Sequence, residues 1–203
     1  MSAPSYIRRH INNLKGDKPF SIRDFLIYGD RNTVDQVFHR LLVEGRIVRV
    51  ARGVYIKDTS APPSLAEIIE VKVKAFGRSI AAHGSQAGHK LNGKEQDKLV
   101  FATNGATTSF RVGNRIVHLI RTSVRKMQLG DSAAGLIIRA LWHLGKRACQ
   151  PETAALLAER LRREDQRNLR LAAAIMPQWM RQCFARFARM DCLRRDLETL
   201  PVG

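Results

Sequence analysis

Polar and basic side chains gather between residues 31 and 57 in types that suit contact with nucleic acid. Arg, Asn, Gln and Thr side chains form hydrogen bonds with base edges, and Arg and Lys also hold phosphate oxygens. We expect the following residues to contact DNA: Arg31, Asn32, Thr33, Gln36, His39, Arg40, Arg49, Arg52 and Lys57. The elements that position them decide whether they form one surface.

The first six of these residues lie in a stretch with helical periodicity. Its apolar side chains repeat at the i, i+3, i+4, i+7 and i+8 spacing of a helix packed along one face. They are Val34, Val37, Phe38, Leu41 and Leu42. The pattern predicts a helix that begins near Asn32 or Thr33 and ends at Gly45, with the polar residues on its outer face.

The stretch GRIVRVARGVYIKD, residues 45–58, predicts a two-stranded hairpin that turns at Gly53. Arginines alternate there with Ile and Val, which alone is also the pattern of a solvated hairpin face. Two shorter helices are expected earlier, over residues 5–14 and from Ser21 to Leu26. Three helices followed by a hairpin predict a winged helix-turn-helix, in which the third helix enters the major groove and the hairpin lies beside the phosphate backbone.

The charge of the chain favours the same class of partner. The 203 residues include 35 Lys and Arg against 18 Asp and Glu, a net charge of +17. A globular chain this basic usually binds a polyanion. We expect no membrane partner and no secretory signal, because no apolar run is long enough for either. Three cysteines without CxxC spacing favour a reducing, cytoplasmic location.

A linker and a second domain are expected to follow. DTSAPPSL, residues 58–65, has the small polar and proline content of a connection, so we expect domains over residues 1–57 and 66–203. The second begins with helical periodicity from Ala66 to Phe76, and a further helix is expected from near Ser85 to the Asn92-Gly93 turn. Residues 98–121 then predict a three-stranded β-meander. The expected fold class is α+β.

Several helices should follow the meander. One is capped by Asp131 or Ser132 and ends at Gly145, a second opens at Pro151, a third runs from about Glu164 to Ile175, and the last begins near Gln178. Basic residues punctuate the meander, and two interpretations stay open for them. They are the exposed face of a half-buried sheet, or a surface for nucleic acid or an acidic partner. These residues are Arg111, Arg115, His118 and Arg121.

Catalysis is not expected. The sequence has no HExxH, GxxxxGK[ST] or GxSxG motif and no pair of acidic residues at a suggestive spacing. His83 and His89 lie six residues apart without a nearby carboxylate or thiol, which is poor spacing for a metal site. We therefore expect no enzyme activity, no cofactor and no bound metal.

The segment from Phe20 to Ile56, above all GRIVRVARGVYI at residues 45–56, resembles the N-terminal module of AbiEi-type antitoxins and of a related group described as type IV antitoxins. The order of later pieces is also similar to that family. These pieces are Phe101 to Asn104, Val112-Gly113, Gly135 to Lys146 and Pro177 to Met180, so the resemblance covers residues 5–185.

The resemblance implies an antitoxin and transcriptional autorepressor that binds an inverted repeat in its own promoter. It also implies a nucleotidyltransferase toxin as functional partner, which need not form a stable complex with the antitoxin. A plain winged-helix repressor or plasmid-maintenance protein without a toxin remains an alternative, as does an RNA-binding protein. Monomers that bind two half-sites cooperatively and a preformed dimer are equally compatible with the sequence.

Overall fold

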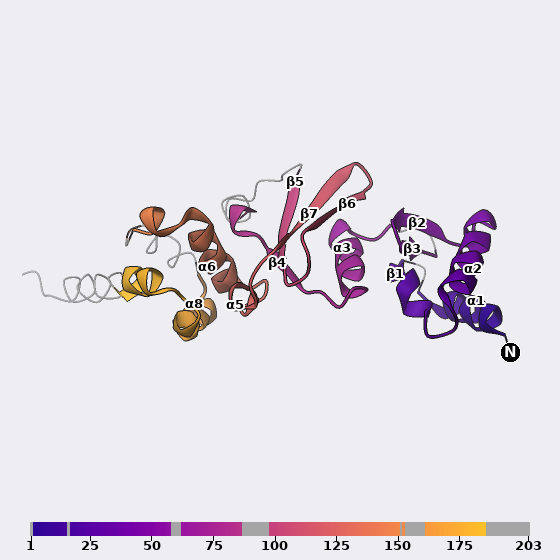
Figure 1. The fold of residues 1–203 in the computed structure, drawn as a ribbon, viewed down its shortest axis with the longest axis horizontal. Helices are drawn as coiled ribbons and strands as arrows, with labels where there is room; N and C mark the ends of the chain where they lie inside the picture. Colours follow the sequence, from indigo (N-terminus) through magenta and orange to yellow (C-terminus); the bar gives the residue numbers. More distant parts are fainter. Residues whose placement is uncertain are drawn as a thin grey trace, which may run out of the picture. The chain divides into compact units, whose positions relative to one another are not determined.

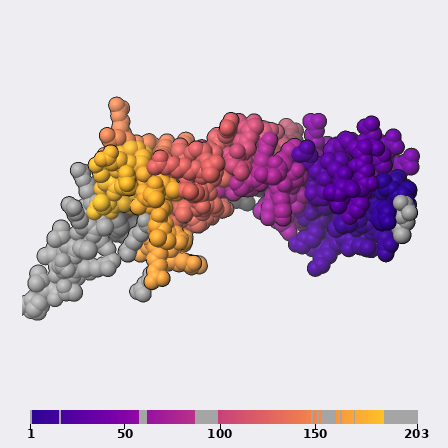
Figure 2. Space-filling view, turned by 60° about the horizontal axis from the view of Figure 1, so that its bottom comes forward, coloured from indigo at the N-terminus to yellow at the C-terminus, as the bar shows by residue number. Residues whose placement is uncertain are grey.

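The computed structural model describes residues 2–15, 17–57, 62–86, 98–150, 152 and 161–185 (Figure 1). The fold is α+β, as expected, and the chain forms two compact units. Unit 1 comprises the described residues of Met1–Ser79, Asp97–Leu99 and Thr107–His118. Unit 2 comprises those of Ile80–Gln96, Val100–Ala106 and Leu119–Gly203. In the space-filling view the described indigo residues at the start of the chain form one closely packed body (Figure 2).

The helices of unit 1 begin where polar side chains cap them. Asp30 accepts a hydrogen bond from the N–H of Thr33 at the start of α2, and Ser21 and Asp24 form a capping box around a short 3-10 helix, η1. Gly45 follows α2 with φ +67°, a conformation that favours glycine at a helix end. The helical elements are α1 (Ala3–Asn13), η1 (Ile22–Phe25), α2 (Arg31–Val43) and α3 (Leu65–Lys74).

Four short strands of unit 1 are ordered β1-β3-β2-β6. Strands β2 and β3 form the expected hairpin, with Arg49 opposite Tyr55 and a register shift between Arg49 and Ala51. Strand β6 pairs with β2 through Val112 and Ala51. The strand β1 was not expected. The bounds are β1 (Phe20–Ser21), β2 (Val48–Ala51), β3 (Val54–Ile56) and β6 (Thr108–Val112).

An aromatic core joins the helices of unit 1 to the hairpin. The ring of Phe38 on α2 lies with its centroid 5.0 Å from that of Tyr55 on β3 and 5.2 Å from that of Phe25 on η1. Ile7 and Ile11 of α1 are also fully buried in this cluster. The apolar stripe of α2 therefore faces the core, as predicted, and its polar stripe faces outward.

Unit 2 contains a short antiparallel pair of strands and several helices. Strand β4 pairs with β5 from Ile80 opposite Thr103 to Ala82 opposite Phe101. Strand β7 begins in unit 1 and ends in unit 2. The bounds are β4 (Ile80–Ala82), η2 (Gly84–Gln86), β5 (Lys98–Thr103), β7 (Arg115–Arg121), α5 (Val124–Met127), α6 (Ala133–Leu144), η3 (Lys146–Ala148), α8 (Arg163–Leu171) and η4 (Ala172–Ala174).

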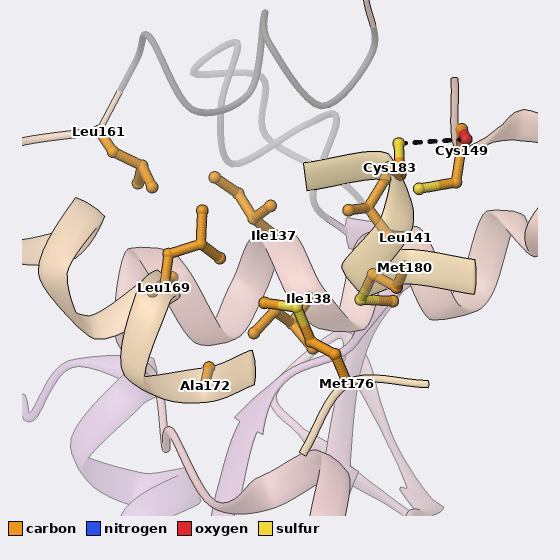
Figure 3. Close-up of a cluster of buried hydrophobic side chains, with 11 residues drawn as sticks. Ile137, Ile138, Leu141, Cys149, Leu161, Leu169, Ala172, Met176, Met180 and Cys183 are labelled. Carbon is orange, nitrogen blue, oxygen red and sulfur yellow. Dashed lines mark hydrogen bonds between the residues drawn. The ribbon is translucent and has the colours of Figure 1, made fainter. Parts of the chain in front are cut away.

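The core of unit 2 is built on α6. Ile137, Ile138 and Leu141 of this helix meet apolar side chains from the segments after residue 160, including Met180 (Figure 3). Leu144 continues the apolar sequence of this helix, but its side chain is 55% exposed. Ile138 and Arg139 are buried instead, so the buried face of α6 is wider than the apolar pattern indicated.

Most of the other expected elements are confirmed. The helix near residues 65–74, the three strands of residues 98–121, the Ser132-capped helix and the helix near residues 164–175 are all present, and residues 178–185 are helical. The prediction that the three strands form a meander is wrong, because β7 lies between β6 and β5 in the strand order and β5 is not a neighbour of β6. The expected helix opening at Pro151 lies outside the described residues, as do residues 87–97 of the one expected from Ser85. Helix α3, assigned from sequence to the C-terminal domain, lies in unit 1.

None of the helices that the structure describes is long and apolar enough to cross a lipid bilayer.

Candidate nucleic-acid interface

The first turn of α2 holds three of the predicted contact residues. Arg31 begins the helix, and its Nε donates to Asp35 Oδ2 at 2.8 Å. Thr33 donates to Asp30 twice, through its N–H at 2.8 Å and its hydroxyl at 3.0 Å. These bonds hold the pKa of Asp30 below its ordinary value and fix the start of the helix. Thr33 is thus a capping partner, and Arg31 keeps its two terminal nitrogens for other contacts.

The rest of the outward face of α2 is exposed. Asn32, Gln36, His39 and Arg40 are spaced so that they share one side of the helix. Among the described residues, the side chains of Gln36, His39 and Arg40 have no hydrogen-bond or ion-pair partner. Together they present donors and acceptors in a row along one rigid element.

The hairpin positions Arg49 and Arg52 in different ways. Arg49 lies on β2 and is exposed, and Arg52 lies in the turn beside Gly53, whose φ is +79°. Lys57 was expected to contact DNA, but in the structure its ammonium group bonds to the protein backbone. Its ammonium donates to the carbonyl oxygens of Asn12 at 2.6 Å and Leu14 at 3.1 Å, so two of its three donors tie the hairpin to the end of α1.

Tyr55 shows that α2 and the hairpin contribute charge to the same place. Burial raises the pKa of its hydroxyl, the positive charges of Arg49 and Arg31 lower it, and the carboxylate of Asp35 raises it. Arg49 comes from β2, whereas Arg31 and Asp35 come from α2. Charged residues of the two elements therefore lie close enough to act on the same side chain.

Lys72 of α3 was not predicted, and it lies beside the hairpin. Its Nζ donates to the carbonyl oxygen of Arg52. Burial lowers the pKa of this ammonium, and the positive charges of Arg52, Arg49 and Arg23 lower it further. We call Arg23, Arg31, Arg49, Arg52 and Lys72 the basic strip. The three charges that act on Lys72 come from η1 and the hairpin, and no local sequence pattern links these elements to α3.

Aromatic rings lie among the cations of the basic strip. The guanidinium carbon of Arg23 is 4.2 Å from the centroid of the Phe76 ring, and that of Arg78 is 5.4 Å from it. Lys72 Nζ lies 5.6 Å from the Phe76 centroid and 5.8 Å from that of Phe110. Phe76 is still 47% exposed. Cations held over aromatic faces are ordered at little cost, and an exposed ring also offers a surface to a base or sugar.

The basic residues of β6 and β7 are compatible with both interpretations, an exposed sheet face and a surface for an anionic partner. Arg111 and Arg115 are exposed, and His118 shares a hydrogen bond of 2.8 Å with the hydroxyl of Ser109. Among the described residues, no three His, Cys, Asp or Glu side chains are grouped so that they could hold a metal ion. The chemistry that the described surface of unit 1 offers is cationic and hydrogen-bonding.

Comparison with known proteins identifies a family for this chain. No curated protein and no solved structure matches the chain. A family model matches residues 6–169 of the 203, a range that begins in α1 and ends in α8 and so includes the whole basic strip. The chain therefore belongs to DUF6088, a family of unknown function.

Proposed function

We propose that this protein binds double-stranded DNA through a winged helix-turn-helix formed by residues 1–57. Helix α2 enters the major groove, and the β2–β3 hairpin is the wing beside the phosphate backbone. The observation that carries the proposal is the basic strip, whose members come from η1, α2, the hairpin and α3 and act on common neighbours. A surface that concentrates positive charge in this way attracts a polyanion.

The two parts of the surface have different tasks in this proposal. Gln36, His39 and Arg40 stand along the outer face of α2 without partners among the described residues, so they are available to base edges. Arg49, Arg52 and Lys72 supply charge at the hairpin, where the duplex backbone passes. The base contacts give sequence preference, and the backbone contacts give affinity.

We also propose the biological role that the AbiEi resemblance implies. The protein represses its own promoter at an inverted repeat and counteracts a nucleotidyltransferase toxin in the cytoplasm, as an antitoxin of type IV. The support is the similarity of GRIVRVARGVYI and of the four later segments, which appear in the same order in that family. Neutralisation in this role does not need a stable complex between toxin and antitoxin.

A mobility-shift titration tests DNA binding. The full chain is titrated with duplex from its own upstream region, unrelated duplex of equal length and single-stranded RNA, between about 50 and 200 mM salt. We expect the upstream duplex to bind most tightly. Preference for the RNA would favour the RNA-binding alternative and contradict the proposal.

Substitutions separate the two tasks. Arg52→Ala and Lys72→Ala should weaken all duplexes alike and reduce the slope of log K against log salt by about 0.9 for each lost phosphate contact. Gln36→Ala and Arg40→Ala should instead reduce the preference for the upstream duplex, by about 1–3 kcal/mol for each lost base contact. Arg9→Ala is the matched control, because it removes one exposed arginine from α1, outside the basic strip. Equal slopes for Arg52→Ala, Lys72→Ala and the wild type would contradict the docking.

Growth rescue tests the antitoxin role separately. The gene is coexpressed with a nucleotidyltransferase gene that neighbours it, and growth is followed after induction of the toxin. The resemblance to AbiEi-type antitoxins implies that the C-terminal domain carries most of the neutralisation, so we expect rescue by the wild type and also by Arg52→Ala. Absence of such a neighbouring gene, together with failure to rescue, would leave a plain repressor.

A further inference from the structure

Unit 2 contains a cavity of about 340 Å³ that the DNA-binding proposal does not use. Its wall includes His83, Arg121, Lys126, Arg139, Trp142 and His143, which come from β4, β7, α5, α6 and the chain next to them. The volume falls at the small end of the range for small-molecule sites, about 300–1,000 Å³. The cavity is thus large enough for a compact organic ligand.

The wall of this cavity is positively charged. It carries Arg121, Lys126 and Arg139, and none of the lining residues that the structure describes is acidic. Asp131 is the nearest compensating charge to Arg139, with 4.0 Å between its Oδ1 and Arg139 Nη2, but it does not line the cavity. The net charge of the residues that line the cavity is therefore positive.

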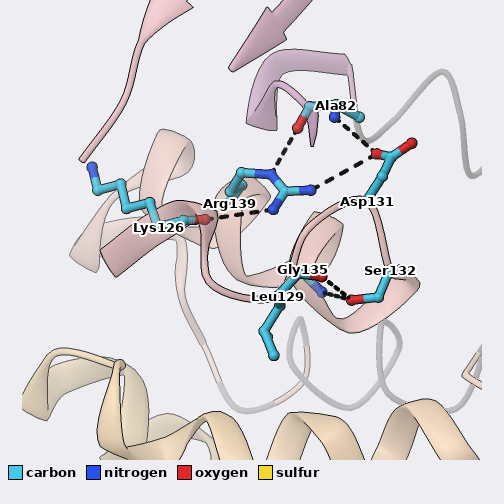
Figure 4. A network of polar contacts seen from close by, with 7 residues as sticks. All are labelled: Ala82, Lys126, Leu129, Asp131, Ser132, Gly135 and Arg139. Atoms are coloured by element: carbon cyan, nitrogen blue, oxygen red, sulfur yellow. Dashed lines mark hydrogen bonds and ion pairs between the residues drawn. The ribbon is translucent and has the colours of Figure 1, made fainter. Parts of the chain in front are cut away.

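Arg139 is a fixed charge rather than a mobile side chain. Its Nε donates to the carbonyl oxygen of Ala82 at 2.7 Å, and its Nη1 to that of Lys126 at 3.5 Å (Figure 4). Its side chain is only 2% exposed, and Nη2 has no hydrogen-bond partner among the described residues. Asp131 accepts a hydrogen bond from the N–H of Ala82 at 2.9 Å, so the N–H and the carbonyl oxygen of Ala82 are both hydrogen-bonded. The charge stays in place without a ligand.

His83 lines the cavity and carries a hydrogen-bond donor. The backbone N–H of Ser85 donates to His83 Nδ1 at 3.2 Å, so in the neutral ring the proton is on Nε2. Burial lowers the pKa of His83, and the nearby charges of His143, Arg139 and Lys126 lower it further. The ring of His143 lies with its centroid 5.4 Å from that of His83, in an edge-to-face arrangement. A neutral Nε2–H is a donor that suits an anion.

Lys126 is the cation that is best placed to move onto a ligand. Its Nζ lies 5.2 Å from the centroid of the Trp142 ring, a weak contact compared with an ion pair. Ser123 also lines the cavity, and its hydroxyl makes no capping bond to α5. Lysine, hydroxyl and imidazole donors around a fixed guanidinium are the groups that hold phosphate oxygens.

We propose that this cavity binds the phosphate group of a small phosphorylated molecule. A phosphate monoester carries nearly two negative charges and three acceptor oxygens, which match three cations and several separate donors better than a carboxylate does. Lys126 and His83 contact the phosphate, and Arg139 stabilises it through its fixed charge. The remaining volume, bounded in part by Trp142, holds the rest of the molecule.

Calorimetric titration with ribose 5-phosphate, inorganic phosphate and ribose tests the proposal at constant ionic strength. Both tryptophans of the chain lie in unit 2, and Trp142 lines the cavity, so tryptophan fluorescence gives a second measurement. We expect both phosphate compounds to bind and ribose not to bind. Binding by neither phosphate compound at about 10 mM, a weak affinity even for a single small ligand, would overturn the proposal.

Variants locate the binding. Lys126→Gln and His83→Gln should each raise the dissociation constant by about tenfold, the size of one lost charge-assisted hydrogen bond, and Lys126→Arg should restore most of the affinity. Lys146→Gln is the matched control, an exposed lysine of unit 2 that does not line the cavity. If Lys126→Gln and His83→Gln bound phosphate as well as Lys146→Gln does, the anion would be bound elsewhere and the proposal would be wrong.

Discussion

Among the glycines of unit 2 that the structure describes, Gly84 is the one at which an added methyl group would meet the closest contacts. A Cβ at this residue would lie 2.1 Å from the carbonyl oxygen of Arg139, 2.7 Å from its carbonyl carbon and 2.8 Å from the Cβ of His143. Carbon atoms pack at about 3.5–4.0 Å, so α6 would have to move by close to an ångström. Because backbone rather than a flexible side chain is in the way, we expect Gly84→Ala to destabilise unit 2 by about 2–3 kcal/mol.

Urea unfolding followed by tryptophan fluorescence measures this effect, since Trp142 and Trp179 both report on unit 2. With a slope of about 1–2 kcal/mol per molar urea, the midpoint should fall by about 1–3 M. The direction of the midpoint shift shows whether the added methyl group clashes. A glycine-to-alanine change without a clash stabilises a protein by about 0.4–1 kcal/mol, because it restricts the unfolded chain.

Gly29→Ala is the control for Gly84→Ala. Its Cβ would approach no atom closer than 3.3 Å, the Cβ of Ala3, and its backbone needs no positive φ. Because Gly29 lies in unit 1 and both tryptophans lie in unit 2, unfolding of this variant is followed by circular dichroism, and we expect its effect on stability to be within about 1 kcal/mol. An unchanged or raised midpoint for Gly84→Ala would refute the close approach of η2 to α6, and with it the position of His83 at the cavity.

Three further predictions concern a carboxylate, a helix cap and a thiol. The ion pair with Lys18 and the capping bonds of Ser64 lower the pKa of Glu67 to about 2, from an ordinary value of 4.5. The stability that it contributes should therefore be complete above about pH 4.5 and be lost as the pH falls toward 2, and Glu67→Gln should lack this dependence in acid unfolding. Ser132→Ala should destabilise unit 2 by about 1 kcal/mol in urea unfolding, because the Ser132 hydroxyl accepts from the N–H of Gly135 at the start of α6; an unchanged midpoint would contradict this. Burial raises the pKa of the Cys149 thiol to about 12, so iodoacetamide at pH 8 should leave it unmodified in peptide mapping until urea is added, and rapid labelling of the native protein would show that it is accessible.

Helix α2 could be predicted because its signal is local. The apolar stripe marks the buried face and Gly45 marks the end, and both are as expected. The start lies at Arg31, slightly before the expected position, because Asp30 rather than a later residue caps the helix. The outer positions of Gln36 and Arg40 follow from the stripe alone.

The neighbours of the hairpin could not be predicted in the same way. Strand β1 has only two residues and exists because it pairs with β3, so its own sequence contains no strand period. Lys57 has the residue type of a phosphate contact, but the distant carbonyl groups of Asn12 and Leu14 hold it. Lys72 reaches the hairpin across 20 residues of sequence. Each of these placements depends on tertiary contacts, which periodicity does not encode.

The cavity of unit 2 also could not be predicted from the sequence. The sequence marks His83 only as a poor metal ligand, and no motif or spacing singles out Arg139. Their relation depends on Gly84, which lets the chain after β4 approach the backbone of α6. A glycine without positive φ gives no turn signal in the sequence, so this approach could be found only in the structure.

The bond from Lys72 to the carbonyl oxygen of Arg52 has a consequence for the thermodynamics of any encounter at the hairpin. A turn that is free in solution loses backbone entropy when a partner orders it, at roughly 1–2 kcal/mol for each residue. The tip of this hairpin is already held from α3, and Lys57 holds its far end from α1. The backbone entropy of this loop is therefore lost when the protein folds rather than when a partner binds. Less of the contact energy is then spent on ordering the loop, and the affinity is higher.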